Sequence, residues 1–217
     1  MTNQIAIIDP FVKTPSTNCF NNLVKVLGIK ATYHIPSVYG LESLLSTRDE
    51  TSGYIILGSA SHVHEKLPWH SALAEFALEE LRKKRPIMGF CFGHQIICHA
   101  LGAKVEYYSA DEEKQMGKRQ VKIKQDFWNF KNGEVFDLAV THKQVVRDLP
   151  AELLEVGVGL PNDIVINRDL PFLGTQAHPE ASNFFCHNDI TNLSESEIGV
   201  VQKGGASLIK RFFEYHF

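Results

Sequence analysis

Residues 86–95 read PIMGFCFGHQ, an apolar run that ends at a cysteine flanked by phenylalanines and glycines. The run Ile87–Phe90 predicts a buried strand, and the stretch Gly93–Leu101, followed by Gly102, predicts a helix. A strand that passes directly into a helix is the repeating unit of parallel α/β sheets. The cysteine between them, Cys91, is therefore expected at the carboxyl edge of such a sheet.

The chain before this stretch also alternates strands with helices. Glycines or prolines follow several of the runs, which marks their ends. Strands covered by helices on both faces are typical of an α/β domain. The predicted strands are Ile5–Ile8, Ala31–Ile35 and Tyr54–Leu57, and the predicted helices are Thr17–Leu27, Val38–Leu45 and Trp69–Lys84.

After Gly102 the pattern changes to short β-like runs and one closing helix. No Pro-rich or Ser-rich linker interrupts it, so we expect a single domain over residues 1–217. The fold class predicted is α/β with three layers: an open, mostly parallel sheet flanked by helices, with antiparallel strands added in the second half. The runs are Val105–Tyr108, Gln120–Lys124, Leu138–Val146, Leu153–Val158, Asp163–Asn167 and Phe172–Gln176, and the helix is Lys203–Tyr215.

Composition excludes several classes of protein. A formal net charge of −3 gives no electrostatic case for binding nucleic acid or an anionic membrane, and the basic cluster Arg82–Arg85 fits the end of a helix. No apolar stretch approaches the roughly 20 residues that span a bilayer, and the N-terminus does not resemble a signal peptide. Four scattered cysteines do not form a disulfide framework. We expect a reduced, cytoplasmic protein, with no cofactor.

The G-x-C-x-G pattern of residues 89–93 is the cysteine form of a nucleophile elbow. Glycines relieve crowding in so sharp a turn, and the cysteine is forced into a strained conformation. The N-terminus of the following helix favours the thiolate of Cys91, and the Phe92 N–H is oriented to stabilise an oxyanion. On this pattern alone, a buried cysteine in a tight turn is an equal alternative.

A metal site is a further alternative at this helix, because Cys91, His94, Cys98 and His99 lie close in sequence. Their spacing matches no common zinc pattern, so no metal is expected.

A thiolate nucleophile needs a base, and the stretch Thr175–Glu180, TQAHPE, offers one. His178 directly follows a predicted strand, and Pro179 stiffens a turn that returns Glu180 to the imidazole. Alone, this segment is an ordinary surface turn. Combined with the elbow it predicts a Cys–His–Glu arrangement for cysteine-dependent acyl transfer.

The motifs GFCFGHQ (89–95) and AHPE (177–180), in this order, resemble the signatures of class I (triad) glutamine amidotransferases. The loop LGSASHVHE (57–65) is similar to the oxyanion loop of that family, and Thr141-His142 followed by Leu149-Pro150 resembles its short histidine motif. Gly204-Gly205, expected to open the last helix, also fits. The resemblance is strongest to the glutaminase domain of GMP synthases and their free-standing relatives, and it implies the flavodoxin-like fold of the family.

The resemblance implies a role for each motif. Cys91 would attack the side-chain amide of glutamine, His178 would protonate the leaving ammonia and then activate water, and Glu180 would orient His178. The oxyanion hole would use the backbone N–H groups of Ser59 and Phe92. Substrate binding would involve Gly58, Gln95 and His142.

Three segments depart from the family pattern: Gly58-Ser59-Ala60, Lys114–Gly117 and Thr141–Gln144. The first bears on the oxyanion hole, and the last two bear on the acyl donor and on where the ammonia goes. Because no synthase domain is recognisable after Glu180, we expect the chain either to dock on a separate synthase or to work alone. Hydrolysis of glutamine to glutamate and ammonia is the first expectation. The alternatives are a stand-alone γ-glutamyl hydrolase or peptidase and, in another class, a catalytically weak regulatory binding module.

Overall fold

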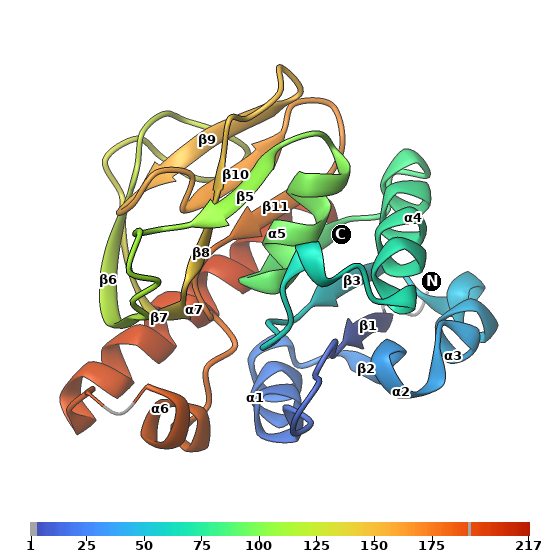
Figure 1. Ribbon diagram of the computed structural model, residues 1–217, viewed down its shortest axis with the longest axis horizontal. Helices are drawn as coiled ribbons and strands as arrows, with labels where there is room; N and C mark the ends of the chain where they lie inside the picture. The colour runs from blue at the N-terminus through green and yellow to red at the C-terminus, as the bar shows by residue number, and fades with distance from the viewer. Residues whose placement is uncertain (1–3, 191) are drawn as a thin grey trace.

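A nine-stranded mixed sheet forms the centre of the molecule, which is described by a computed structural model over residues 4–190 and 192–217 (Figure 1). The strand order is β2-β1-β3-β4-β11-β10-β9-β6-β7. The first five are mutually parallel, and the remaining pairings are antiparallel. The bounds are β1 Gln4–Ile8, β2 Lys30–His34, β3 Gly53–Ile56, β4 Ile87–Phe90, β6 Gln115–Ile123, β7 Val135–His142, β9 Leu153–Val158, β10 Ile164–Asn167 and β11 Phe172–Thr175.

Helices cover both faces of this sheet, which confirms the predicted three-layer α/β fold. Alternate residues of β1 show the layers: Ile5 and Ile7 pack with α1 and α7, whereas Ala6 and Ile8 pack with α4 and α5. Because side chains alternate across a strand, one apolar run supplies both cores. The longer helices are α1 Thr17–Leu27, α4 Pro68–Arg82, α5 Phe92–Ala100 and α7 Glu195–His216. None of the helices in the described part of the chain has the length and apolar character needed to cross a membrane.

The remaining elements are short. The predicted run Leu138–Val146 is wrong as one strand: the chain leaves β7 at His142 and enters β8, Gln144–Arg147, which pairs with β5, Lys104–Tyr107, in a separate two-stranded sheet. The predicted helix Val38–Leu45 is likewise divided, because Gly40 has a φ of 63°. The short helices are α2 Pro36–Tyr39, α3 Glu42–Ser46 and α6 Asn183–Asp189, with 3₁₀ turns η1 Arg48–Glu50 and η2 Val63–Glu65.

The last helix, α7, starts eight residues before the predicted Lys203. Ser194 and Glu197 form a capping box: the Ser194 hydroxyl accepts from the Glu197 N–H, and the Glu197 carboxylate accepts from the Ser194 N–H. Gly204 and Gly205 therefore lie inside the helix and do not open it. A Cβ on Gly205 would lie 2.3 Å from the Pro179 carbonyl oxygen, so this glycine lets α7 pack directly against the turn that carries His178.

Candidate active site

The predicted turn from strand to helix is present at Cys91, which follows β4 and caps the N-terminus of α5. Its φ of 47° and ψ of −100° are unusual for a residue with a Cβ. Glycines make the turn sterically feasible: a Cβ on Gly89 would lie 2.6 Å from the Gly93 carbonyl, and one on Gly93 would lie 2.2 Å from the Ile56 oxygen. The elbow therefore stacks α5 closely onto β3.

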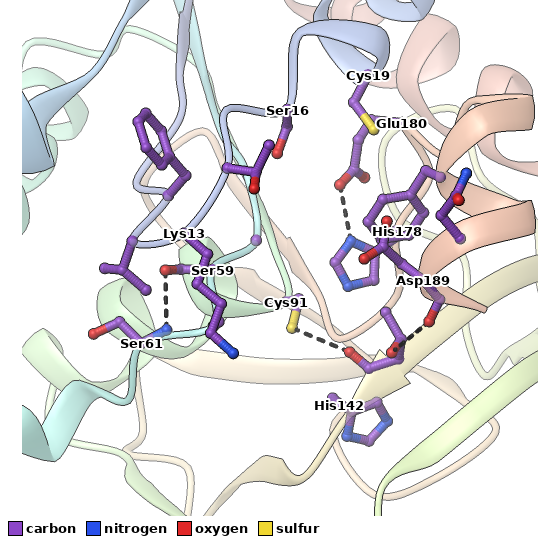
Figure 2. A pocket seen from close by; sticks show the side chains of 18 of the residues that line it. Lys13, Ser16, Cys19, Ser59, Ser61, Cys91, His142, His178, Glu180 and Asp189 are labelled. Carbon is purple, nitrogen blue, oxygen red and sulfur yellow. Dashed lines mark hydrogen bonds and ion pairs between the residues drawn. The ribbon is translucent and has the colours of Figure 1, made fainter. Parts of the chain in front are cut away.

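His178 and Glu180 reach the same edge of the sheet as Cys91. Strands β4 and β11 are parallel neighbours, with Phe90 opposite Thr175, so the residues that follow them emerge together. His178 Nδ1 donates to a Glu180 carboxylate oxygen at 2.9 Å, and both side chains are buried. Figure 2 shows the His178 ring between the Glu180 carboxylate and the Cys91 sulfur. The other ring nitrogen, Nε2, has no hydrogen-bond partner among the described residues, so it is available to interact with the Cys91 sulfur.

The charge state of His178 follows from these neighbours. Burial alone would lower the pKa of His178, but the Glu180 carboxylate and the Cys91 side chain outweigh it and raise this pKa to about 10. The ring is therefore an imidazolium at neutral pH. The Cys91 sulfur itself points to the Thr141 carbonyl oxygen, 4.0 Å away.

The loop after β3 packs against this pair. A Cβ on Gly58 would lie 2.6 Å from His178 Cε1 and 3.4 Å from Cys91 Cβ, so the backbone of the loop is in contact with the site. Neither the Ser59 N–H nor the Phe92 N–H donates a hydrogen bond within residues 4–190 and 192–217. Two free N–H groups beside a cysteine are what an oxyanion hole requires.

Replacing Gly58 by alanine should therefore displace the His178 ring. A displacement of about 1 Å can cost about 100-fold in rate, so kcat of a reaction that uses His178 should fall by about that factor. Gly199→Ala is the matched control, because an added Cβ there meets no atom within 4 Å. Steady-state kinetics of both variants check this, and a fully active Gly58→Ala protein would show that the ring tolerates movement.

A cavity of about 640 Å³ opens above Cys91 and His178. Of the sequence-predicted binding residues, Gly58, Gln95 and His142 all line it, as does Ser59. Phe92 does not, and its side chain is fully buried in the core. The wall also includes the loop 11–16, Lys114, Thr141, Lys143, Gln144 and the α6 residues Phe184, Phe185, Asn188 and Asp189.

Gln95 and His142 share one acceptor beneath the cavity. Gln95 Nε2 donates to the Gln144 carbonyl at 3.0 Å and to the Gln176 side chain at 3.2 Å. His142 Nδ1 donates to the same Gln144 carbonyl at 3.0 Å, and burial, together with the Arg119 charge, lowers the pKa of His142 to about 3. His142 is therefore neutral and cannot serve as a cation in the site.

Sequence reasoning missed two elements that shape the site. The first is helix α6, which was not predicted although Ser182 caps it, and whose Phe185 ring lies 4.9 Å from that of His178. The loop 11–16 was also missed. Its signal was the Asp9-Pro10 pair at the end of β1, which places a loop at the same edge of the sheet.

The arrangement of the side chains on α5 does not support the alternative of a metal site there. His94 is fully buried, with Nδ1 3.4 Å from Cys98 Sγ, in space that Gly174 leaves open. Among residues 4–190 and 192–217, no three His, Cys, Asp or Glu side chains gather closely enough to hold a metal ion.

Comparison with known proteins places these motifs in a family. The model of the family described as glutamine amidotransferase class-I matches residues 20–184. The chain is 31% identical to a glutamine-hydrolyzing GMP synthase of Wolbachia sp. subsp. Brugia malayi over 144 residues, which is 62% of this chain and 27% of that protein. It is 28% identical to the enzyme of the same name from Wolbachia pipientis wMel over 189 residues, 82% of this chain and 34% of that protein. The chain thus spans about a third or less of these relatives.

Solved structures share the whole fold at low sequence identity. A glutamine amidotransferase from Thermotoga maritima superposes with a TM-score of 0.74 at 18% identity, covering 100% of this chain and 98% of that chain. A glutamine amido transferase from Methylobacillus flagellatus gives a TM-score of 0.75 at 17% identity, covering 99% and 95%. These two likenesses concern the fold, whereas the family model matches well over half of the sequence itself. The chain belongs to the class-I glutamine amidotransferase family.

Proposed function

We propose that this protein hydrolyses the side-chain amide of glutamine to glutamate and ammonia through a γ-glutamyl thioester on Cys91. The observation that carries the proposal is the buried His178–Glu180 pair beside a strained cysteine on the floor of a cavity. Family membership supports glutamine as the substrate. The arrangement of the side chains supports the choice of nucleophile and base.

The first half of the reaction forms the thioester. The Cys91 sulfur attacks the amide carbon, and the carbonyl oxygen becomes an oxyanion that the Ser59 and Phe92 N–H groups stabilise. The His178 imidazolium then gives its proton to the amide nitrogen, the C–N bond breaks and ammonia leaves. A raised pKa suits this step, because the ring already carries the proton at neutral pH.

The second half returns the enzyme to its starting state. Once the sulfur is acylated it has no charge, so one of the two neighbours that raise the pKa of His178 is neutralised. The neutral ring can then take a proton from water, which attacks the thioester carbon. Collapse of this intermediate expels the sulfur, releases glutamate and leaves the His178 ring protonated again. Glu180 holds Nδ1 throughout, so that Nε2 is the atom that exchanges protons.

The fate of the ammonia is part of the proposal. The relatives named GMP synthase are about three to four times as long as the segment that this chain matches. We propose that the segment matching these relatives carries the glutamine-hydrolysing step, and that the ammonia is either released or passed to a synthase subunit. The substrate-binding roles of Gly58, Gln95 and His142 rest on their position in the cavity wall.

Purified protein mixed with glutamine should release ammonia and glutamate in equal amounts without added ATP. The same assay with γ-glutamyl dipeptides tests the hydrolase alternative, because faster release of the amino acid than of ammonia would favour it. Mass spectrometry of the acid-quenched protein should find a γ-glutamyl adduct on the peptide that contains Cys91. Neither product nor adduct, with any of these substrates, would leave only a binding role.

A further inference from the structure

The Ser59 hydroxyl ties the loop after β3 to a distant part of the chain. It donates to the Pro10 carbonyl oxygen at 2.6 Å and accepts from the Ser61 N–H at 3.0 Å. Ser59 is half-buried, so water competes only in part for these bonds. Figure 2 shows the Ser59–Ser61 bond at the wall of the cavity that faces Cys91.

The acceptor of the Ser59 hydroxyl, the Pro10 carbonyl, is itself held in place. Pro10 follows Asp9, which is fully buried at the end of β1 and whose N–H donates to the His34 carbonyl at 2.8 Å. The Asp9 carboxylate accepts from the Ser16 N–H at 2.6 Å and from the Tyr33 hydroxyl. Both ends of the loop 10–16 are thereby fixed to one carboxylate, and Pro10 is a rigid acceptor.

The far end of the loop after β3 is anchored separately. The Ser61 hydroxyl donates to the Glu65 carboxylate and accepts from His70 Nε2 at 3.0 Å. The His70 ring lies 5.2 Å from that of Phe92, at the start of α5. The loop is thus fastened to the N-terminal loop by Ser59 and toward the elbow by Ser61, with Gly58 against the His178 ring.

We propose that the side chain of Ser59 is a positioning residue of this active site: by tying the loop to Pro10, it holds the Ser59 N–H in place for the oxyanion before substrate binds. The inference rests on the proposed function, since the oxyanion belongs to that reaction. It separates two roles of one residue, because the N–H stabilises the charge while the hydroxyl fixes the N–H. A donor that needs no reorganisation is worth more in a transition state than one that must be ordered.

Such a role has a specific kinetic signature. The oxyanion exists only in the transition states and intermediates, so a loosened donor should lower kcat and kcat/KM equally and leave KM unchanged. Loss of a whole oxyanion donor costs about 10²–10³ in kcat, so loosening one should cost about tenfold. If the Ser59 hydroxyl only stabilised the fold, its removal would not lower kcat while leaving KM unchanged.

Ser59→Ala is the central test, because it keeps the N–H and removes the hydroxyl. We expect kcat on glutamine to fall about tenfold with KM within about a factor of two. Ser59→Thr keeps a hydroxyl and should restore most of the loss. Ser71→Ala is the matched control: Ser71 is exposed on α4, its hydroxyl also donates to a proline carbonyl, that of Pro68 at 3.4 Å, and its removal should change nothing.

Hydrogen exchange of the Ser61 amide supplies a readout that does not depend on glutamine. This amide donates to Ser59 Oγ, so it should exchange faster in Ser59→Ala than in the wild type and in Ser59→Thr. An active wild type with unchanged kcat in Ser59→Ala would overturn the inference and leave the proposed function intact. If the wild type fails to hydrolyse glutamine, the proposed function fails and the catalytic role of Ser59 falls with it, whatever the exchange result.

Discussion

Replacing Cys91 by alanine should abolish the release of ammonia from glutamine, with kcat reduced by at least about 10⁴-fold. Without the sulfur no thioester can form, and water would have to attack the amide directly. The cavity residues Gly58, Gln95 and His142 are unchanged, so the variant should still bind glutamine, which calorimetry can measure as a dissociation constant. The γ-glutamyl adduct should disappear from the Cys91 peptide at the same time.

Comparing Cys91→Gly with Cys91→Ala separates the loss of the nucleophile from the relief of backbone strain at this position. Cys91 has a positive φ, which costs about 1–3 kcal/mol for a residue with a Cβ. Cys91→Gly relieves that strain and Cys91→Ala does not, so the glycine variant should have the higher free energy of unfolding, by about 1 kcal/mol. Both should be inactive. Substantial activity in either protein would exclude Cys91 as the nucleophile.

The elbow was predictable because its determinants are local. Gly89, Cys91 and Gly93 are separated by single residues, and the clashes that glycine avoids involve Gly93 itself and the adjacent strand β3. His178 was predictable for a different reason. It follows a strand, and the carboxyl ends of parallel strands share one edge, so the register of β4 with β11 brings it to Cys91.

Contacts between distant segments were not predictable from the sequence. Nothing local marks Pro10 as the acceptor for Ser59, 49 residues away, because that bond depends on how the loops after β1 and β3 meet. Gly205 was misinterpreted for the same reason. A glycine pair commonly marks a helix end, whereas here the close approach of Pro179 to α7 requires it. The capping box at Ser194 and Glu197 was visible in the sequence and gives the true start.

The substitution Glu180→Gln should lower kcat by about 10³-fold or more and shift the pH dependence of the reaction. Burial lowers the pKa of His178, while the Glu180 carboxylate and the Cys91 side chain raise it to about 10. Removing the carboxylate charge leaves burial opposed by Cys91 alone, so this pKa falls. In the proposed reaction this imidazolium protonates the leaving ammonia. As the pH rises, the variant would lose that proton at a lower pH than the wild type does. Profiles of kcat between pH 6 and pH 10 should show the alkaline decline of the variant beginning earlier.

The same pair makes a prediction about stability, whose sign follows from the raised pKa. A histidine whose pKa is raised by folding stabilises the protein fully below its unfolded value of about 6.5, and loses that contribution as the pH rises through the folded value. The excess stability of the wild type over Glu180→Gln should therefore be largest near pH 6 and shrink toward pH 10, measured as the difference in Tm. Glu195→Gln is the control, because Glu195 pairs with His187 on the surface at 3.4 Å with both side chains exposed. A Tm difference that stays constant across this range would mean that His178 is not held as an imidazolium by Glu180. In that case the ring would enter the reaction as a base, and the proton for ammonia would have to come from Cys91.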